Sequence, residues 1–385
     1  MADFQNPQQE PGSEKRLLLA FVLTMLILLL MQPFISRYTK QSQPPAPAPP
    51  QQQAAQPPPA APAPPQAKTP AKGKPAAQPA GAETKVATAE TETVVENDLY
   101  KITFSNHGAL VKSWVLKKYH DDKGNPLELV NELAAAKYGY PLSLWSYDEG
   151  LRKKLSDVLY VPSATGVQHA PASLTFQYSE AGTVVRKTFT FDHSYVVKAD
   201  TSVEVNGSPV QSFLVWPAGF GDQTVPSSYG AARIDYQSGD TIERVSAKKV
   251  VGGNTLRGPF HWAGVVDQYF AAVFLPSEPD QASMVTFHEP LDIPKDLDKP
   301  DPTKVEKVTV LGAGVGNVNG PTVERIFVGP KALDVVKSVH ASLSKEELAR
   351  VSPAERAAAE GPDLEGLVDF GKYLGFIAKP LFQWL

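Results

Sequence analysis

The 385-residue chain contains no cysteine. Disulfide bonds, thiol catalysis and thiolate metal sites are therefore excluded. The chain also lacks an excess of positive charge, since 37 Lys and Arg stand against 41 Asp and Glu for a net charge of −4. Nucleic-acid binding needs a basic face, so nucleic acid is not an expected partner. Without disulfides, an exported domain depends on burial of its core, which a domain of about 290 residues can supply.

Recognisable patterns of metal or phosphate sites are missing as well. The glycine-rich run at 312–320 does not have the GxGxxG spacing and precedes a strand, so we expect a hairpin or loop between strands. Residues 219–222 likewise predict a loop. No cofactor, metal or small-molecule substrate is expected. The histidines are scattered and none forms a pair at metal-ligand spacing: His107, His120, His169, His193, His261, His288 and His340.

Charge is absent from residues 17–35, LLLAFVLTMLILLLMQPFI. This run gives roughly 28 Å of helix, close to the thickness of a bilayer core, and predicts a transmembrane helix after a cytoplasmic tail at 1–16. A cleavable signal peptide is the alternative, but its apolar region is usually shorter and ends in small residues rather than Gln32-Pro33-Phe34. Flanking basic residues barely decide the orientation, and the large downstream domain favours a cytoplasmic N-terminus. The candidate membrane contacts here are Leu17, Phe21, Leu28 and Phe34.

Proline, alanine and glutamine dominate residues 36–92, which predicts a disordered, partly polyproline spacer. Residues 93–329 show short alternating or apolar runs separated by Gly, Pro, Asn and Asp. Many such runs with few helices between them predict a mainly β, antiparallel domain, a large double-sheet sandwich. The expected strands lie within 98–105, 109–119, 173–179, 184–192, 194–205, 212–217, 243–249, 265–276, 283–289, 304–314 and 322–330.

The chain closes on predicted helices. Residues 330–340 have helical spacing within a segment of linker helices at 330–360, and Ser344–Glu347 and Ser352–Glu355 both match capping boxes. Residues 361–385 form an amphipathic pattern that suits a membrane interface, followed from Phe376 by the start of a second span. A terminal helix packed on its own domain is the alternative. The candidate membrane contacts are Phe370, Leu374, Phe376, Lys379, Phe382 and Trp384.

Four stretches resemble the Gram-negative YidC branch of the YidC/Oxa/Alb membrane protein insertases. They are VVENDLYKITFSNHGALVKSWVLKKY at 94–119, FHWAGVVDQYFAAVFLP at 260–276, RIFVGPKALDVVKSV at 325–339 and, most specifically, LVDFGKYLGFIAKPLF at 367–382. The resemblance implies a mutarotase-like β super-sandwich in the periplasm, anchored in the bacterial inner membrane. It also implies a role in inserting and folding nascent membrane proteins with or beside the Sec translocon, in contact with the lipid bilayer and without enzymatic activity.

The core spans that form the family's hydrophilic groove have no counterpart in this sequence. We therefore expect a fragment or an N-terminal half that needs the remaining spans, and no insertion by this chain alone.

Two other functions stay open. One is a membrane-anchored carbohydrate-binding or carbohydrate-active sandwich, for which His261 and Asp267 would be the acid and base, although ordinary structural roles are the simpler interpretation. The other is an anchored adaptor for translocon or wall components. Five aromatic residues could line a sugar or peptide cleft, although core packing is the simpler interpretation for each: Trp114, Tyr119, Trp145, Trp216 and Trp262.

Overall fold

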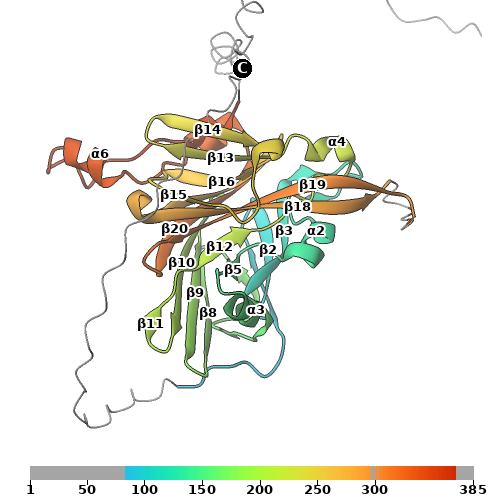
Figure 1. The fold of residues 1–385 in the computed structure, drawn as a ribbon, viewed down its shortest axis with the longest axis horizontal. Coiled ribbons are helices and arrows are strands. Elements are labelled where there is room, and N and C mark those ends of the chain that lie inside the picture. The colour runs from blue at the N-terminus through green and yellow to red at the C-terminus, as the bar shows by residue number, and fades with distance from the viewer. Residues whose placement is uncertain (1–82, 296–298, 300, 302, 370–385) are drawn as a thin grey trace, which may run out of the picture. The chain divides into compact units, whose positions relative to one another are not determined.

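The computed structural model describes residues 83–295, 299, 301 and 303–369 (Figure 1). The predicted transmembrane helix at 17–35 and most of the spacer lie outside the described residues. Pairing with the β domain begins before the expected boundary at residue 93. Lys85 and Ser179 exchange backbone hydrogen bonds of 2.9 Å in both directions, and the N–H of Ala87 donates to Leu159. The last residues assigned to the spacer therefore belong to the domain.

The described strands form three sheets. The first sheet has the order β4–β3–β2–β1–β7, with β1 Glu92–Glu96, β2 Tyr100–Ser105, β3 Leu110–His120, β4 Pro126–Glu128 and β7 Gly166–His169. The large sheet has the order β14–β13–β16–β17–β20–β10–β9–β8–β6, with β11 beside β10. Its strands are β6 Val161–Pro162, β8 Ala172–Glu180, β9 Thr183–Phe191, β10 Val196–Val205, β11 Ser208–Pro209, β13 Arg233–Ser238, β14 Thr241–Ser246, β16 Trp262–Val266, β17 Phe270–Pro276 and β20 Thr322–Pro330.

The third sheet has the order β15–β18–β19–β12–β5, with β5 Ser143–Trp145, β12 Phe213–Trp216, β15 Thr255–Arg257, β18 Ala282–Pro294 and β19 Val305–Asn317. Neighbouring strands are antiparallel throughout these sheets, apart from the parallel pair β1 and β7. The predicted mainly β, antiparallel architecture is confirmed. In Figure 1 the hairpin of β18 and β19 projects well beyond its neighbours.

Short helices occupy the connections. They are α2 Glu132–Tyr138, α3 Glu149–Asp157, α4 Pro226–Tyr229, α5 Leu333–Lys337 and α6 Lys345–Arg350, with 3₁₀ turns η2 Ala247–Lys249, η3 Pro279–Gln281 and η4 Leu364–Leu367. The capping box predicted at Ser344 and Glu347 is confirmed at the start of α6. The second predicted box is wrong as a helix start, because residues 353–358 form turns. There the side chains of Ser352 and Glu355 only bond each other, at 2.6 Å.

The core lies between the sheets. The first sheet packs on the β8–β10 part of the large sheet, where the ring of Phe104 lies 5.3–5.9 Å from those of Phe176, Phe189 and Phe191. The third sheet packs on β16 and β17. Strand β9 alternates between buried and more exposed residues as its sequence predicts. In contrast, every residue of β16 and β17 is buried, which explains their unbroken apolar sequence.

Two expectations about strands need correction. Residues 265–276 were expected as one run, but a turn at Asp267–Tyr269 divides them between β16 and β17. The glycine-rich run was expected as a hairpin or loop, but Gly312, Gly314 and Gly316 lie within β19, and only Asn317–Gly320 turns. A Cβ atom on these glycines would collide with the backbone of β12 and of the residues beside it, so the glycines allow the close approach of two strands.

The described part of the expected interfacial helix is a single 3₁₀ turn. Asp363 caps this turn, η4, and Leu364 and Leu367 are fully buried in the core. The start of the segment at 361–385 therefore packs on the domain, as the alternative interpretation expected for a terminal helix. Both leucines belong to the apolar face of the amphipathic pattern at 361–385, and the domain core covers them. Residues 370–385 lie outside the described residues.

Candidate functional site

The side chains of His261 and Asp267 interact with different residues in the structure. Nδ1 of His261 lies 2.9 Å from the backbone oxygen of Ser342, and Nε2 lies 3.0 Å from Oε1 of Glu347. Oδ1 of Asp267 accepts hydrogen bonds from the N–H groups of Tyr269 and Phe270 at 2.8 and 2.7 Å, which closes the β16–β17 turn. Each side chain therefore has a structural role, as the simpler interpretation expected.

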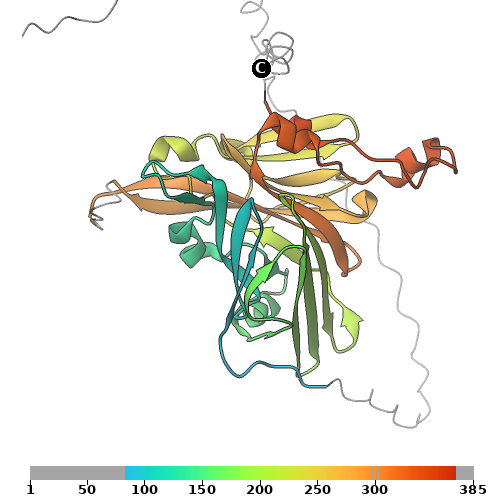
Figure 2. The ribbon, with the colours of Figure 1, turned by 180° about the vertical axis from the view of Figure 1, so that it is seen from behind.

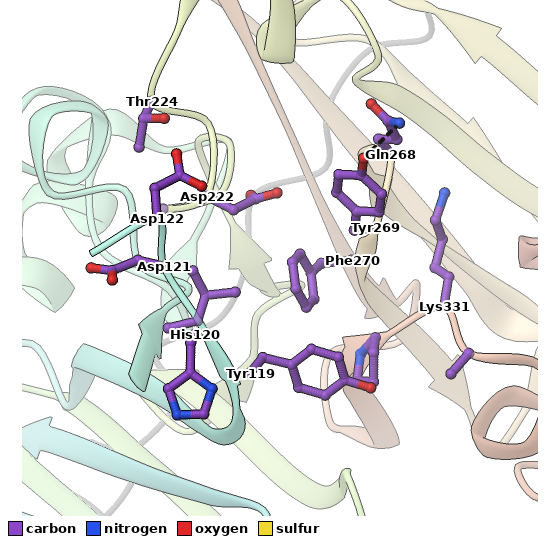
Figure 3. A pocket seen from close by; sticks show the side chains of 14 residues that line it. Tyr119, His120, Asp121, Asp122, Asp222, Thr224, Gln268, Tyr269, Phe270 and Lys331 are labelled. Carbon is purple, nitrogen blue, oxygen red and sulfur yellow. Dashed lines mark hydrogen bonds between the residues drawn. The ribbon is translucent and has the colours of Figure 1, made fainter. Parts of the chain in front are cut away.

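A cavity of about 490 Å³ opens beside this turn (Figure 3). It lies between the end of β3, the loop at 221–224, the β16–β17 turn and the residues that follow β20. Figure 3 shows Asp121, Asp122 and Asp222 on one side, Lys331 on the other, and aromatic rings between them. We call this cavity the carboxyl pocket, and its principal residues are Tyr119, Asp122, Asp222, Tyr269, Phe270 and Lys331.

Asp222 lines the pocket and has the carboxyl group of Asp267 as a neighbour. Burial, and next the neighbouring carboxyl of Asp267, raise the pKa of Asp222 to about 8. Oδ1 of Asp222 and Oδ2 of Asp267 are buried and accept no hydrogen bond from any other described residue. Two carboxyl groups can bond each other only when one holds a proton, and the raised pKa of Asp222 makes Asp222 the group that holds it at neutral pH.

Lys331 fastens the chain after β20 to the same turn. Its Nζ donates to the backbone oxygen of Asp267 at 2.5 Å, and its N–H donates to Tyr269 at 2.8 Å. Burial, and next the charge of Arg233, lower the pKa of Lys331. The ammonium group of Lys331 therefore already has a hydrogen-bond acceptor within the protein.

Aromatic rings supply the apolar surface of the carboxyl pocket. Tyr119 and Phe270 meet edge to face, with ring centroids 5.7 Å apart and planes at 85°. Tyr269 is 60% exposed at the rim. Of the five aromatic residues singled out from the sequence, Tyr119 thus lines a cleft. Trp114, Trp216 and Trp262 are instead buried in the core.

The fifth aromatic residue, Trp145, lines a second cavity of about 600 Å³ on the third sheet. Arg152 lies 5.4 Å from the Trp145 ring centroid, and Lys112 lies 3.9 Å from that of Tyr140, which also lines this cavity. Cations over rings are a common way to cover aromatic surface, so this arrangement does not by itself indicate a ligand.

A charged cluster holds the last described residues of the chain. The guanidinium of Arg233 donates to both carboxylate oxygens of Asp235 at 3.2 and 3.1 Å and to Asp369 at 3.2 Å. Arg244 donates to the backbone oxygen of Gly366 at 2.7 Å and lies 3.9 Å from Asp369. We call Arg233, Asp235, Arg244 and Asp369 the exit clamp. Seen from behind, the last described residues lie over the strands that carry it (Figure 2).

The clamp holds a buried charge. The Asp235 side chain is fully buried, and burial raises its pKa although Arg233 and Arg244 oppose the shift. Gly366 packs closely against the side chain of Ile242 in β14, because a Cβ atom at position 366 would collide with it. The start of the segment at 361–385 is therefore locked onto β13 and β14.

The residues predicted from sequence to contact the membrane all lie outside the described residues, so their roles stay predictions. Among the described residues, no helix has the length and apolar character needed to cross a bilayer. Within the same part of the chain, no three His, Asp or Glu side chains are arranged to hold a metal ion.

Sequence reasoning missed Asp222, Lys331 and the exit clamp as site residues. The loop at 219–222 and the end of β20 were located correctly, but nothing in the sequence shows that they meet.

Comparison with solved structures shows remote likenesses to sugar mutarotases. A galactose mutarotase-like protein from Lactobacillus casei is 11% identical, with a TM-score of 0.38, and the match covers 62% of this chain and 99% of that one. A galactose mutarotase related enzyme from Lactobacillus acidophilus is 10% identical, with a TM-score of 0.35, over 62% and 97% of the two chains. Likenesses of this strength carry no information on activity.

The described fold is a β domain whose chain continues past a clamped exit, and the sequence comparison defines its class. Residues 92–384 match the model of the YidC periplasmic domain. The chain belongs to this family.

Named relatives extend the match almost to the full length of this chain. The membrane protein insertase YidC of Syntrophus aciditrophicus is 26% identical over 96% of this chain and 64% of its own. The membrane protein insertase YidC of Geobacter metallireducens is 27% identical over 97% of this chain and 63% of its own. The membrane protein insertase YidC of Chlorobaculum parvum is 25% identical over 88% of this chain and 55% of its own. The chain thus spans between about half and two thirds of the length of these relatives.

Proposed function

We propose that this chain is the anchor and periplasmic domain of a membrane protein insertase of the bacterial inner membrane. The observation that carries the proposal is the family match at 92–384, joined to relatives named as insertases over almost the whole chain. Residues 17–35 would form the anchor, and residues 361–385 would return the chain to the membrane surface. The exit clamp supports this arrangement, because it fixes where the chain leaves the β domain.

The proposed partners are nascent membrane proteins, components of the Sec translocon and the lipid bilayer. In this role the domain positions and contacts other chains, and no covalent step is required. Insertion itself would depend on the part of the relatives that this chain does not span. The carbohydrate alternative has lost its main argument, since His261 and Asp267 have separate structural partners.

Membrane fractionation of the full chain tests the anchor. We expect the chain in the carbonate-resistant membrane fraction, and a variant without residues 17–35 in the soluble periplasmic fraction. A full chain that is released from membranes by carbonate would contradict the proposed anchor.

Photocrosslinking tests the insertase role separately. A photoreactive residue replaces one of three exposed side chains, Tyr147, Val225 or Tyr269. We expect crosslinks to newly synthesised membrane proteins at one or more positions, above the level obtained with a soluble exported protein made at the same rate. A membrane-bound chain whose crosslinks do not exceed that control would contradict the insertase role and leave the anchor intact.

A further inference from the structure

We propose that the carboxyl pocket binds a primary alkylammonium group, with the ammonium at Asp222 and the alkyl chain against Phe270 and Tyr119. The shape of the cavity supports both halves of such a ligand. A volume of about 490 Å³ is open to solvent between a carboxyl wall and an aromatic floor. Pockets of this kind bind through apolar surface and take their specificity from a few polar groups.

The charges around Asp222 favour a cation. From the turn, Asp267 faces it with a carboxyl that is 2% exposed and whose Oδ2 finds no donor in another described residue. From β3 and the residues just after it come His120, Asp121 and Asp122, and from α4 comes the neutral hydroxyl of Tyr229. The hydrogen bonds of Asp121 are already used within its own turn.

Lys331, the one Lys or Arg among the residues that line the pocket, does not neutralise this wall. Its ammonium is bonded to the backbone oxygen of Asp267, and Figure 3 shows it across the cavity from Asp222. An anion entering the pocket would face three carboxyl groups, and a neutral sugar would leave the proton on Asp222 in place. A ligand ammonium can replace that proton, so that Asp222 ionises beside a positive charge.

The exchange balances without another reactant. Protonated Asp222 releases one proton to solvent, and the ammonium takes its place as hydrogen-bond donor to the carboxylate. The neighbouring rings of Phe270 and Tyr269 add a favourable surface for the cation and its chain. Binding at neutral pH should therefore release up to about one proton for each amine bound, as the linkage of ligand and proton binding requires.

The test is calorimetric titration of the purified full-length chain in detergent with n-hexylammonium chloride, with 1-hexanol and hexanoate as probes of the same length. Titration in two buffers of different ionisation enthalpy counts the released protons. We expect the ammonium to bind at least about tenfold more tightly than the alcohol, the scale of one charge-assisted hydrogen bond. Proton release should accompany the binding of hexylammonium, and neither hexanol nor hexanoate should cause it.

Variants locate the site. Asp222→Asn should weaken binding at least about tenfold and abolish proton release. Asp200→Asn, on an exposed position of β10, should change neither. Tyr269→Ala removes an aromatic ring but keeps the carboxyl pair, so it should weaken binding while preserving proton release. This variant replaces Asp222→Asn as the test if circular dichroism shows that Asp222→Asn is poorly folded.

Three results would overturn the proposal. They are equal binding of hexanol and hexylammonium, unchanged affinity and proton release in Asp222→Asn, and binding of methyl glucoside in place of the amine. Leucyl-leucinamide and its N-acetylated form then distinguish two sources of the same group. Binding of the free dipeptide amide assigns the pocket to polypeptide amino termini, and binding of hexylammonium alone assigns it to small free amines. This titration does not depend on the insertase role, so either proposal can fail without the other.

Discussion

Asp222 makes the stability of the domain depend on pH. Its pKa rises from the ordinary 3.8 to about 8, first because of burial and then because of Asp267. Between these values the unfolded chain has lost a proton that the folded chain keeps, so the free energy of unfolding falls as pH rises through this window.

The Asp222→Asn variant should remove that dependence, since its amide can donate to Asp267 at every pH. Relative to the wild type, we expect the variant to gain at least about 2 kcal/mol between pH 4 and pH 8.5, measured by urea unfolding. Asp200→Asn is the control and should parallel the wild type. Parallel curves for Asp222→Asn as well would show that the carboxyl pair does not share a proton.

Lys187 is fully buried in β9 and holds two unusual turns. Its Nζ donates to the backbone oxygens of Ala109 and Leu142, the latter at 2.6 Å. Both residues adopt positive φ values, 49° and 58°, which side-chain-bearing residues rarely do. The hydrogen bonds therefore fix backbone that would otherwise relax.

We predict that Lys187→Met lowers the free energy of unfolding by about 2–4 kcal/mol, because two buried carbonyl groups lose their donor. Burial lowers the pKa of Lys187 to about 7, so wild-type stability should rise as pH increases from 7 toward 10.5, and the variant should lack this rise. Urea unfolding at neutral and alkaline pH measures both effects. Lys198→Met, exposed on β10, is the control, and an equal loss in both variants would contradict the role of Lys187.

At the scale of elements, the strands were predictable where one face meets solvent. In β9 and β10 the alternation marks the buried face directly. The residue pattern alone does not show the division between β16 and β17, because both strands are buried throughout and only Asp267 closes the turn between them. The capping pattern at Ser352 predicted a helix that does not form. A local capping pattern is not sufficient for a helix, since it does not supply an apolar face to bury.

The glycines of β19 could not be understood from the sequence, because their reason lies in another strand. A Cβ atom on Gly312 would lie 2.6 Å from the backbone oxygen of Trp216 and closer still to that of Pro217. We expect Gly312→Ala to lower the free energy of unfolding by about 1–3 kcal/mol, the usual cost of overpacking.

Gly150→Ala is the control for this substitution. Gly150 lies in α3, and its Cβ would meet only the carboxylate of Asp148, the N-cap of that helix, at 3.3 Å. Alanine there should leave stability unchanged or raise it by up to about 1 kcal/mol. If thermal unfolding shows both variants to be equally stable, close approach of β12 and β19 does not explain the glycine.

At the scale of the whole molecule, the sequence indicated the order of the parts but not their junctions. Composition and periodicity located the β domain, and they predict an anchor and a spacer before it and a closing segment after it. The carboxyl pocket and the exit clamp do not, because each brings together residues more than 100 positions apart, such as Arg233 and Asp369. No periodic pattern records a contact of that kind.

The exit clamp should decide how firmly the closing segment is held. Arg233→Met would remove the cation that is hydrogen-bonded to the buried Asp235 and leave it only Arg244, 4.0 Å away, and the charge of Lys331, so we expect a loss of about 2–4 kcal/mol in the free energy of unfolding. Asp369 would also lose its hydrogen bond from Arg233. Amide hydrogen exchange should therefore accelerate at 361–369 more than in β9, because local opening needs less free energy.

Arg350→Met is the matched control, since the ion pair of Arg350 with Glu346 is exposed on both sides. Exposed pairs contribute little, so its loss should stay below about 1 kcal/mol, with exchange at 361–369 unchanged. The Arg233→Met variant could instead be destabilised while amide exchange at 361–369 accelerates no more than in β9. That result would show that the exit clamp stabilises only β13 and β14. Faster exchange confined to 361–369 would instead show that this cluster joins the β domain to the segment that follows it. Under the proposed function, that link would let the periplasmic domain act on the membrane part of the insertase.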